Sequence, residues 1–459
     1  MPRPLRAVVA TCLVLALASS VAAETSVLPM RERAAVIDGW IAHRVEHVLP
    51  ALMRRADIDL WVLISREYNE DPVLETFLPA TWQSARRRTI LLIHDRGPEH
   101  PLETLAVARY PVGDTFVQAW DKERDGDQWT HLARLIDARN PERIGVNVSD
   151  TFALADGLTH TEHELLLEAL PERLRGRVVS AEDLAIGWLE TRSAPELEVY
   201  PQIVRIAHEI IAEGLSEAVI QPGVTTTEDV QWWYRERIRE RGLTAWFHPS
   251  VSVQRPEDGT VDHKAEVLAD GVAVIRPGDL VHVDFGITYL RLNTDTQQMA
   301  YILRPGETEA PAALREALAR GNRLQDVLTG QFATGRTGNE VLAAALAQAE
   351  DEGITASIYT HPIGFHGHAA GATIGLWDQQ GGVPGPGDYP LYPDTAWSIE
   401  LYAASELPGW GGEVRIKLEE DAFFDGESVR YLDGRQTRFH LIPRPGGAAC
   451  CTLGVPAPR

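Results

Sequence analysis

The feature that most constrains the fold is a change in sequence pattern near residue 190. Before this point, short apolar runs alternate with segments in which apolar residues recur every three or four positions. That alternation is typical of an α/β domain. The sequence Ser193-Ala194-Pro195-Glu196 is a capping box with proline in the first turn, which predicts the start of a long helix. We therefore predict an α/β domain over residues 24–190 and a second domain over residues 191–443.

The predicted elements differ in kind between the two domains. In the first domain we expect helices over residues 30–56, 128–138 and 162–170 and strands over residues 59–65, 89–94, 105–110 and 143–148. In the second domain we expect two helices, over residues 194–219 and 225–242, followed by strands and turns with one helical insert over residues 310–352. The expected fold class is therefore α/β at the N-terminus and α+β at the C-terminus.

The N-terminal segment predicts export. Arg3 and Arg6 precede an apolar run over residues 7–17, and small residues follow it and end at Ala23. This is the pattern of a secretory signal peptide over residues 1–23, so we expect a secreted or periplasmic protein. No later stretch approaches the roughly 20 apolar residues of a membrane helix, so no membrane association is expected after signal removal. Residues 444–459 are expected to form a loose tail.

The charge balance excludes one class of partner. The chain has 43 Lys and Arg residues against 66 Asp and Glu residues, which gives a net charge of −23. Such a surface repels phosphate backbones, so nucleic acid is not an expected partner. The same acidic excess supplies carboxylates for a metal site.

Two aspartates are the first candidates for such a site. Alternation over residues 280–287 places His282 and Asp284 on the side of the predicted strand opposite its apolar face. Asp295 lies 11 residues after Asp284, so a tight hairpin centred near residues 289–290 would set the two carboxylates opposite each other. Paired like charges destabilise a sheet, which favours a divalent cation between them. Two solvated aspartates on an exposed face are the alternative.

Three further segments extend the acidic pair to a ligand set. Residues 360–368 form a glycine-containing segment with three histidines, of which His361 is the first. Glu400 and Glu419 each lie on the polar side of a predicted strand, over residues 396–402 and 414–421. Each glutamate alone is typical of a solvated side chain. Together with Asp284 and Asp295 they provide four carboxylates and one imidazole, which is a ligand set for two divalent ions.

These residues resemble the pita-bread metallopeptidases, which include methionine aminopeptidase, aminopeptidase P, prolidase and the metal-free creatinase. The resemblance rests on the spacing of the two aspartates, on HPIG from His361 with His368 seven residues later, and on the segments IEL and IKLEED. It covers residues 193–440, and the first domain is similar to the N-terminal domain of the aminopeptidase P, prolidase and creatinase branch. The resemblance implies a pita-bread catalytic domain over residues 191–443.

The resemblance also implies roles for the five ligands. Asp284 would bind one ion, Asp295 and Glu419 would bridge two ions, and His361 and Glu400 would complete the second site. Manganese is the expected metal, with cobalt, zinc or iron as alternatives, because carboxylate-rich sites accept all four.

Catalytic roles follow from the same resemblance. Glu400 would carry a proton to the leaving amine, and His368 would hydrogen-bond the substrate carbonyl or oxyanion. An upstream substrate-contacting histidine is expected before Asp284. His263 is the nearest candidate and His248 is the second.

Three positions depart from the family pattern. Ser357 stands where proline-directed members have a histidine, Leu401 follows Glu400 in place of proline, and Lys417 replaces an arginine. These departures lie around the substrate pocket, so metal-dependent hydrolysis is better supported than a preference for Xaa-Pro bonds.

The expected function is therefore an exported, dinuclear metal-dependent peptidase that removes an N-terminal residue from short peptides. Its activity would be that of an Xaa-Pro aminopeptidase or dipeptidase, in a homodimer. Two alternatives remain at this point. One is a pita-bread binding protein without catalysis, and the other is a metal-free, creatinase-like C–N hydrolase.

Overall fold

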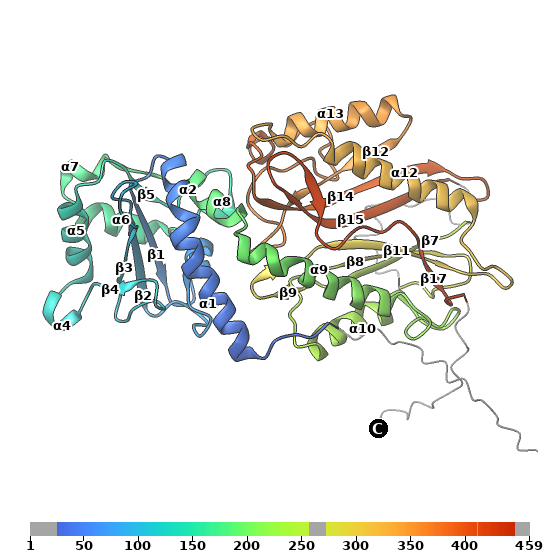
Figure 1. The fold of residues 1–459 in the computed structure, drawn as a ribbon, viewed down its shortest axis with the longest axis horizontal. Coiled ribbons are helices and arrows are strands. Elements are labelled where there is room, and N and C mark those ends of the chain that lie inside the picture. The colour runs from blue at the N-terminus through green and yellow to red at the C-terminus, as the bar shows by residue number, and fades with distance from the viewer. Residues whose placement is uncertain (1–24, 257–271, 411, 446–459) are drawn as a thin grey trace, which may run out of the picture.

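The computed structural model describes residues 25–256, 272–410 and 412–445. Figure 1 shows two units side by side, a smaller one formed by the first part of the chain and a larger one formed by the rest. The expected signal peptide and residues 446–459 of the expected tail lie outside the described residues. None of the helices in the described ranges has the length and apolar character that a bilayer crossing requires.

The N-terminal unit is built on a mixed sheet with strand order β4-β3-β2-β1-β5-β6. Its elements are α1 (Met30–His47), α2 (Leu49–Arg55), β1 (Leu60–Arg66), α3 (Pro72–Phe77), β2 (Arg88–His94), β3 (Glu103–Val107), β4 (Val117–Gln118), α4 (Lys122–Asp125), α5 (Gln128–Arg139), β5 (Ile144–Val146), a 3-10 turn (Ala153–Ala155), α6 (His160–Ala169), α7 (Glu172–Arg175), β6 (Val178–Ser180) and α8 (Glu182–Glu190).

Both faces of this smaller sheet are buried. In β1, Trp61 and Leu63 enter one apolar cluster with Trp188 of α8, whereas Val62 and Ile64 enter a second cluster on the other face. A sheet buried on both faces explains why its strands read as continuous apolar runs. The α/β class predicted for this part of the chain is confirmed.

The C-terminal unit is built on a larger, mainly antiparallel sheet with strand order β12-β14-β15-β11-β8-β7. Its elements are α9 (Ala194–Gly214), α10 (Thr227–Glu240), β7 (Ser250–Gln254), β8 (Leu280–Phe285), β9 (Thr288–Tyr289), β10 (Leu292–Asn293), β11 (Thr296–Ile302), α12 (Ala312–Thr329), α13 (Gly338–Asp351), β12 (Thr355–Ile358), β13 (His361–Pro362), a 3-10 turn (Pro386–Asp388), β14 (Thr395–Glu406), β15 (Glu413–Phe424), β16 (Val429–Tyr431) and β17 (His440–Ile442).

Alternation along these strands divides the larger sheet into an apolar face and a polar face. Val281, Val283 and Phe285 of β8 pack with residues of α9 and α10. On β15, Ile416 and Leu418 lie against Gly321 of α12, where an added Cβ would come within 3.0 Å of both side chains. The helices therefore cover the apolar face, and the acidic side chains between these residues point to the other face.

Two predictions about helices are wrong in detail. The helix predicted over residues 30–56 is divided at Val48, because Pro50 begins a new first turn in α2 and cannot donate the backbone hydrogen bond that a continuous helix needs. The helical insert over residues 310–352 is two helices, because Thr337 caps α13 through a capping box with Glu340.

The predicted hairpin register is wrong by two residues. The turn lies at Leu290 and Arg291, which both have positive φ (53° and 65°). Asp284 is therefore paired with Gln297 instead of Asp295. The two aspartates still lie on the same face of the sheet, because the shift is an even number of residues.

A buried ion cluster joins the two units. Arg44 of α1 donates a 2.8 Å hydrogen bond to Glu196 of α9, and Arg192 lies 3.5 Å from the same carboxylate. All three side chains are at most 1% exposed. Burial lowers the pKa of the Arg44 guanidinium to about 10, while the Glu196 carboxylate opposes that shift. Glu196 also closes the predicted capping box with Ser193, so one side chain serves both the helix start and the junction.

Candidate active site

Four polar side chains form a row across the polar face of the larger sheet. Asp284 of β8 is paired with Gln297 of β11, Gln297 with Glu419 of β15, and Glu419 with Glu400 of β14. Paired residues on neighbouring strands have Cβ atoms roughly 5 Å apart. Asp295 immediately precedes β11 and is buried. Rigid strands therefore hold the four predicted acidic ligands close together.

The histidine segment approaches this row from β13. His361 Nδ1 lies 2.9 Å from the carbonyl oxygen of Pro362, so Nδ1 is the protonated nitrogen and Nε2 has a free lone pair. Nε2 lies 3.6 Å from Glu419 and 3.7 Å from Asp295. This tautomer suits His361 for binding a metal ion through Nε2.

The structure brings the five predicted ligands together in overlapping groups. One group holds Asp284, Asp295 and Glu419, and a second holds His361, Glu400 and Glu419, with the ligand atoms of each group within 4.8 Å of one another. These groups agree with the division into two ion sites that the resemblance implies, although the assignment of individual ligands stays a prediction.

Two buried atoms in this cluster have no hydrogen-bond partner among the described residues. They are His361 Nε2 and Asp295 Oδ1. A buried polar atom without a partner costs about 1–3 kcal/mol, so native proteins rarely leave one. Both are ligand atoms that a divalent cation would satisfy, and the residues therefore fit the metal that the resemblance implies.

The electrostatics of the cluster also favour a cation. Burial raises the pKa of Asp284, Asp295 and Glu400 well above the ordinary carboxyl values, and the charge of neighbouring Glu419 raises all three further. The charge of Lys417 lowers the pKa of Asp284 and Glu400 in part, but a group of carboxylates with so little positive charge nearby is costly in its charged form. A divalent ion would add positive charge and keep the carboxylates ionised.

His368 lies at the rim of the cluster. It is exposed, with its ring 4.8 Å from that of His361 and 5.3 Å from that of Trp246. It can also join Asp295 and His361 as a third possible ligand group. Its predicted contact with substrate stays a prediction.

The upstream histidine is not located. His263 lies outside the described residues. His248 is exposed, and its Nδ1 lies 3.3 Å from the Arg235 guanidinium. Its ring is tilted against that of Trp232, and it does not belong to any of the three possible ligand groups of the described residues.

Hydrogen bonds join the chain just before Asp295 to the chain just after His361. The backbone N–H and side-chain amide of Asn293 both donate to the carbonyl oxygen of Gly364, at 2.8 and 3.0 Å. Phe365, the next residue, lies against the buried guanidinium groups of Arg44 and Arg192, at 5.0 and 4.6 Å from its ring centroid. The histidine segment is thus held on one side by the hairpin that precedes Asp295 and on the other side by the junction between the units.

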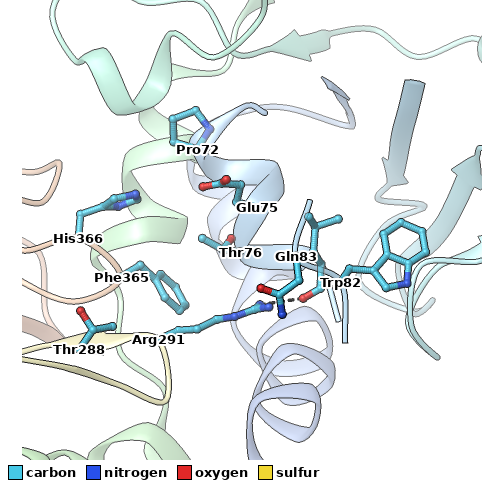
Figure 2. A pocket seen from close by; sticks show the side chains of 10 residues that line it. Pro72, Glu75, Thr76, Trp82, Gln83, Thr288, Arg291, Phe365 and His366 are labelled. Atoms are coloured by element: carbon cyan, nitrogen blue, oxygen red, sulfur yellow. Dashed lines mark hydrogen bonds between the residues drawn. The ribbon is translucent and has the colours of Figure 1, made fainter. Parts of the chain in front are cut away.

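A cavity of about 270 Å³ lies between the units beside this segment. Figure 2 shows Glu75 and Thr76 of α3 on one side of the cavity, with Arg291 and His366 on the other. Burial and the charge of Arg192 lower the pKa of His366 to about 4, so the imidazole is neutral near pH 7. The N-terminal unit therefore forms one wall of a cavity whose other wall includes Phe365 and His366 of the histidine segment.

Several residues of the site were not predicted from the sequence. Gln297 and Ser398 both donate hydrogen bonds to Glu419, and Thr360 accepts one from the Glu400 backbone. Asp421 accepts the Asp295 backbone N–H at 3.2 Å. Alternation along the strands that follow Asp295 and contain Glu419 also places Gln297 and Asp421 on the polar face, and this signal was present in the sequence.

A protein-family model decides the assignment. The model of metallopeptidase family M24 matches residues 202–421, the region that contains the whole cluster. The C-terminal unit of this chain belongs to family M24. The M24 assignment identifies the chain as a metallopeptidase, that is, an enzyme that hydrolyses peptide bonds, and it confirms the predicted pita-bread fold.

Solved structures share the fold over most of the chain. The X-Pro aminopeptidase from Thermotoga maritima MSB8 is 18% identical with a TM-score of 0.59, covering 85% of this chain and 99% of its own. The Xaa-Pro dipeptidase from Bacillus anthracis is 18% identical with a TM-score of 0.54, covering 90% of this chain and 100% of its own. Dipeptidase PepE from Mycobacterium ulcerans is 18% identical with a TM-score of 0.54, covering 89% of this chain and 99% of its own. A comparison with curated protein sequences found no match.

Proposed function

We propose that this M24 protein is a dinuclear metal-dependent peptidase that removes the N-terminal residue from short peptides and acts as a homodimer. The observation that carries the proposal is the partly buried cluster of five ligands, in which His361 Nε2 and Asp295 Oδ1 have no hydrogen-bond partner among the described residues. A binding protein without catalysis would have no use for buried like charges that destabilise the metal-free fold. The same cluster argues against a metal-free hydrolase.

The proposed reaction uses three kinds of group. Divalent cations at the cluster would polarise the scissile carbonyl and lower the pKa of water. Glu400, on a rigid strand and paired with Glu419, which belongs to both ligand groups, would carry a proton to the leaving amine. His368, exposed at the rim, would donate a hydrogen bond to the carbonyl oxygen as it becomes an oxyanion.

Hydrolysis of Ala-Pro-Ala in the presence of manganese tests the metal dependence. We expect release of free alanine by the protein supplied with manganese, and no release after exhaustive dialysis against a chelator. Activity should return when manganese is added back, because the ligand cluster remains folded. Full activity of the chelated, metal-free protein would contradict the proposal.

Preference for proline is the finer part of the proposal. It is supported by the structural neighbours, of which one is an X-Pro aminopeptidase and another an Xaa-Pro dipeptidase. We expect kcat/KM for Ala-Pro-Ala to exceed that for Ala-Ala-Ala by about tenfold or more. Ala-Pro, measured beside them, would separate dipeptidase from aminopeptidase activity. A preference for Ala-Ala-Ala would contradict the proline assignment and leave the metallopeptidase chemistry intact.

We also propose that the protein is exported, on the basis of the basic and apolar pattern of residues 1–23. Mass spectrometry of protein recovered from the periplasm or medium of a bacterial host should find an N-terminus near Glu24. Recovery of the chain only in the cytosol, with Met1 intact or removed alone, would contradict this part of the proposal.

A further inference from the structure

Gln297 lies at the centre of the polar row, between acidic side chains on both neighbouring strands. It is paired with Asp284 on β8 and with Glu419 on β15, and it is 3% exposed. An amide at this position places no charge among the carboxylates. It offers two N–H donors and one carbonyl acceptor to its neighbours.

The amide nitrogen of Gln297 joins two carboxylates. It donates one hydrogen bond to Glu400 Oε1 and one to Glu419 Oε2, the latter at 2.7 Å. Glu400 and Glu419 are directly paired on neighbouring strands, where like charges repel each other. The two donated hydrogen bonds offset this repulsion and fix the side-chain rotation of both glutamates.

A second residue fixes the orientation of the amide. His282 Nε2 lies 2.7 Å from Gln297 Oε1, so Nε2 carries the proton and donates it to the amide oxygen. His282 Nδ1 is then an acceptor, and the Ser252 hydroxyl lies 3.4 Å from it. The hydrogen bonds from Ser252 to His282, from His282 to Gln297 and from Gln297 to the glutamates thus all run in one direction, toward the carboxylates. A reversed amide would place its nitrogen against a donor and its oxygen against two carboxylates.

We propose that Gln297 is a positioning residue of the candidate metal centre, held in orientation by His282. It keeps Glu400 and Glu419 at the separation at which both bind the ion that His361 also binds. The inference rests on the proposed metal site, and it adds a role for a neutral side chain that does not itself bind the ion. Groups that orient metal ligands through hydrogen bonds typically contribute about 10- to 100-fold to metal affinity.

Gln297→Met tests the inference, because methionine keeps the length of the side chain and removes its hydrogen bonds. Gln298→Met is the matched control. Gln298 is the next residue on β11, it is also buried, and its amide bonds Glu420 at 3.1 Å on the other face of the sheet. Both variants lose one buried amide, but only the first one affects the cluster.

Isothermal titration of manganese into metal-free, full-length protein gives the readout. We expect the Kd of Gln297→Met to rise about 10- to 100-fold, with Gln298→Met within about threefold of the unaltered protein. Circular dichroism of the metal-free proteins reports whether each variant folds. Unchanged affinity in Gln297→Met, or an equal loss in Gln298→Met, would overturn the inference.

His282→Phe supplies an independent measurement if Gln297→Met does not fold. It leaves Gln297 in place but removes the donor that orients the amide, so we expect a smaller rise in Kd, of about three- to tenfold. No change in this variant would overturn the role of His282 and the orientation argument with it. If the unaltered protein binds no manganese, cobalt or zinc, the proposed metal centre is contradicted. If the unaltered protein binds metal and the variants bind it equally tightly, only the role of Gln297 is contradicted.

Discussion

Asp295→Asn is expected to lower the manganese content of the protein and to lower kcat/KM for peptide hydrolysis by at least about a hundredfold. Asp295 belongs to two of the possible ligand groups, and its Oδ1 has no other partner among the described residues. A neutral amide oxygen is a weaker ligand than a carboxylate, so the proposed ions would be held less tightly. Metal analysis after gel filtration, together with steady-state kinetics, measures both effects.

The metal-free form of this variant provides a control for folding. Burial and the charges of Glu419 and Asp284 raise the pKa of Asp295, which means that its ionised form is unfavourable without a cation. The metal-free Asp295→Asn protein should therefore melt at a temperature at least as high as that of the metal-free parent. A lower melting temperature would indicate a structural defect in place of a lost ligand.

His368→Ala is the comparison that separates binding from catalysis. His368 is at the rim, so this variant should keep its manganese and lose mainly kcat. If the metal content of His368→Ala fell as far as that of Asp295→Asn, His368 would be a ligand, and the assignment of His361 would have to be reconsidered.

Glu196→Gln is expected to reduce the free energy of unfolding by about 3–5 kcal/mol, the typical cost of removing one partner from a buried ion pair. The Glu196 carboxylate is fully buried and is the shared anion of Arg44 and Arg192. Glutamine has nearly the same shape but no charge, so two buried guanidinium groups would lose their common partner. Urea unfolding, followed by tryptophan fluorescence, measures the loss.

Glu198→Gln is the matched control for this measurement. Glu198 lies two residues further along α9 and is exposed, so its loss should change the stability by less than about 0.5 kcal/mol. Equal stability of the two variants would contradict the view that the junction depends on Glu196.

The sequence allowed the acidic ligands to be predicted because period-two alternation determines which face a strand residue occupies. Asp284, Glu400 and Glu419 could each be assigned to a polar face from their immediate neighbours. The hairpin register could not be predicted in the same way. Leu290 and Arg291 adopt positive φ at the turn although neither is glycine, asparagine or aspartate, the residues that usually signal such a turn.

Tertiary contacts explain why that unusual turn is stable. The Arg291 guanidinium donates a 2.7 Å hydrogen bond to the carbonyl oxygen of Leu78 in the N-terminal unit. This hydrogen bond offsets the free-energy cost of the strained backbone at the turn. Leu78 is more than 200 residues away in sequence, with a separation of 213. A contact over this separation leaves no signal in the sequence around the turn, so the register of the hairpin could not be predicted. Without the register, the position of Gln297 opposite Asp284 could not be predicted either.

The carboxylate ligands and the histidines are held by different parts of the fold, and this affects which substitutions can move them. The carboxylates belong to strands of the C-terminal sheet, whereas Phe365 ties the histidine segment to arginines at the junction. In the proposed site, Glu400 and Glu419 therefore depend on the C-terminal sheet alone, whereas the alignment of His361 and His368 depends on both units. If the proposed site is correct, substitutions in the N-terminal unit would change the position of the two histidines and leave the two glutamates of the sheet in place.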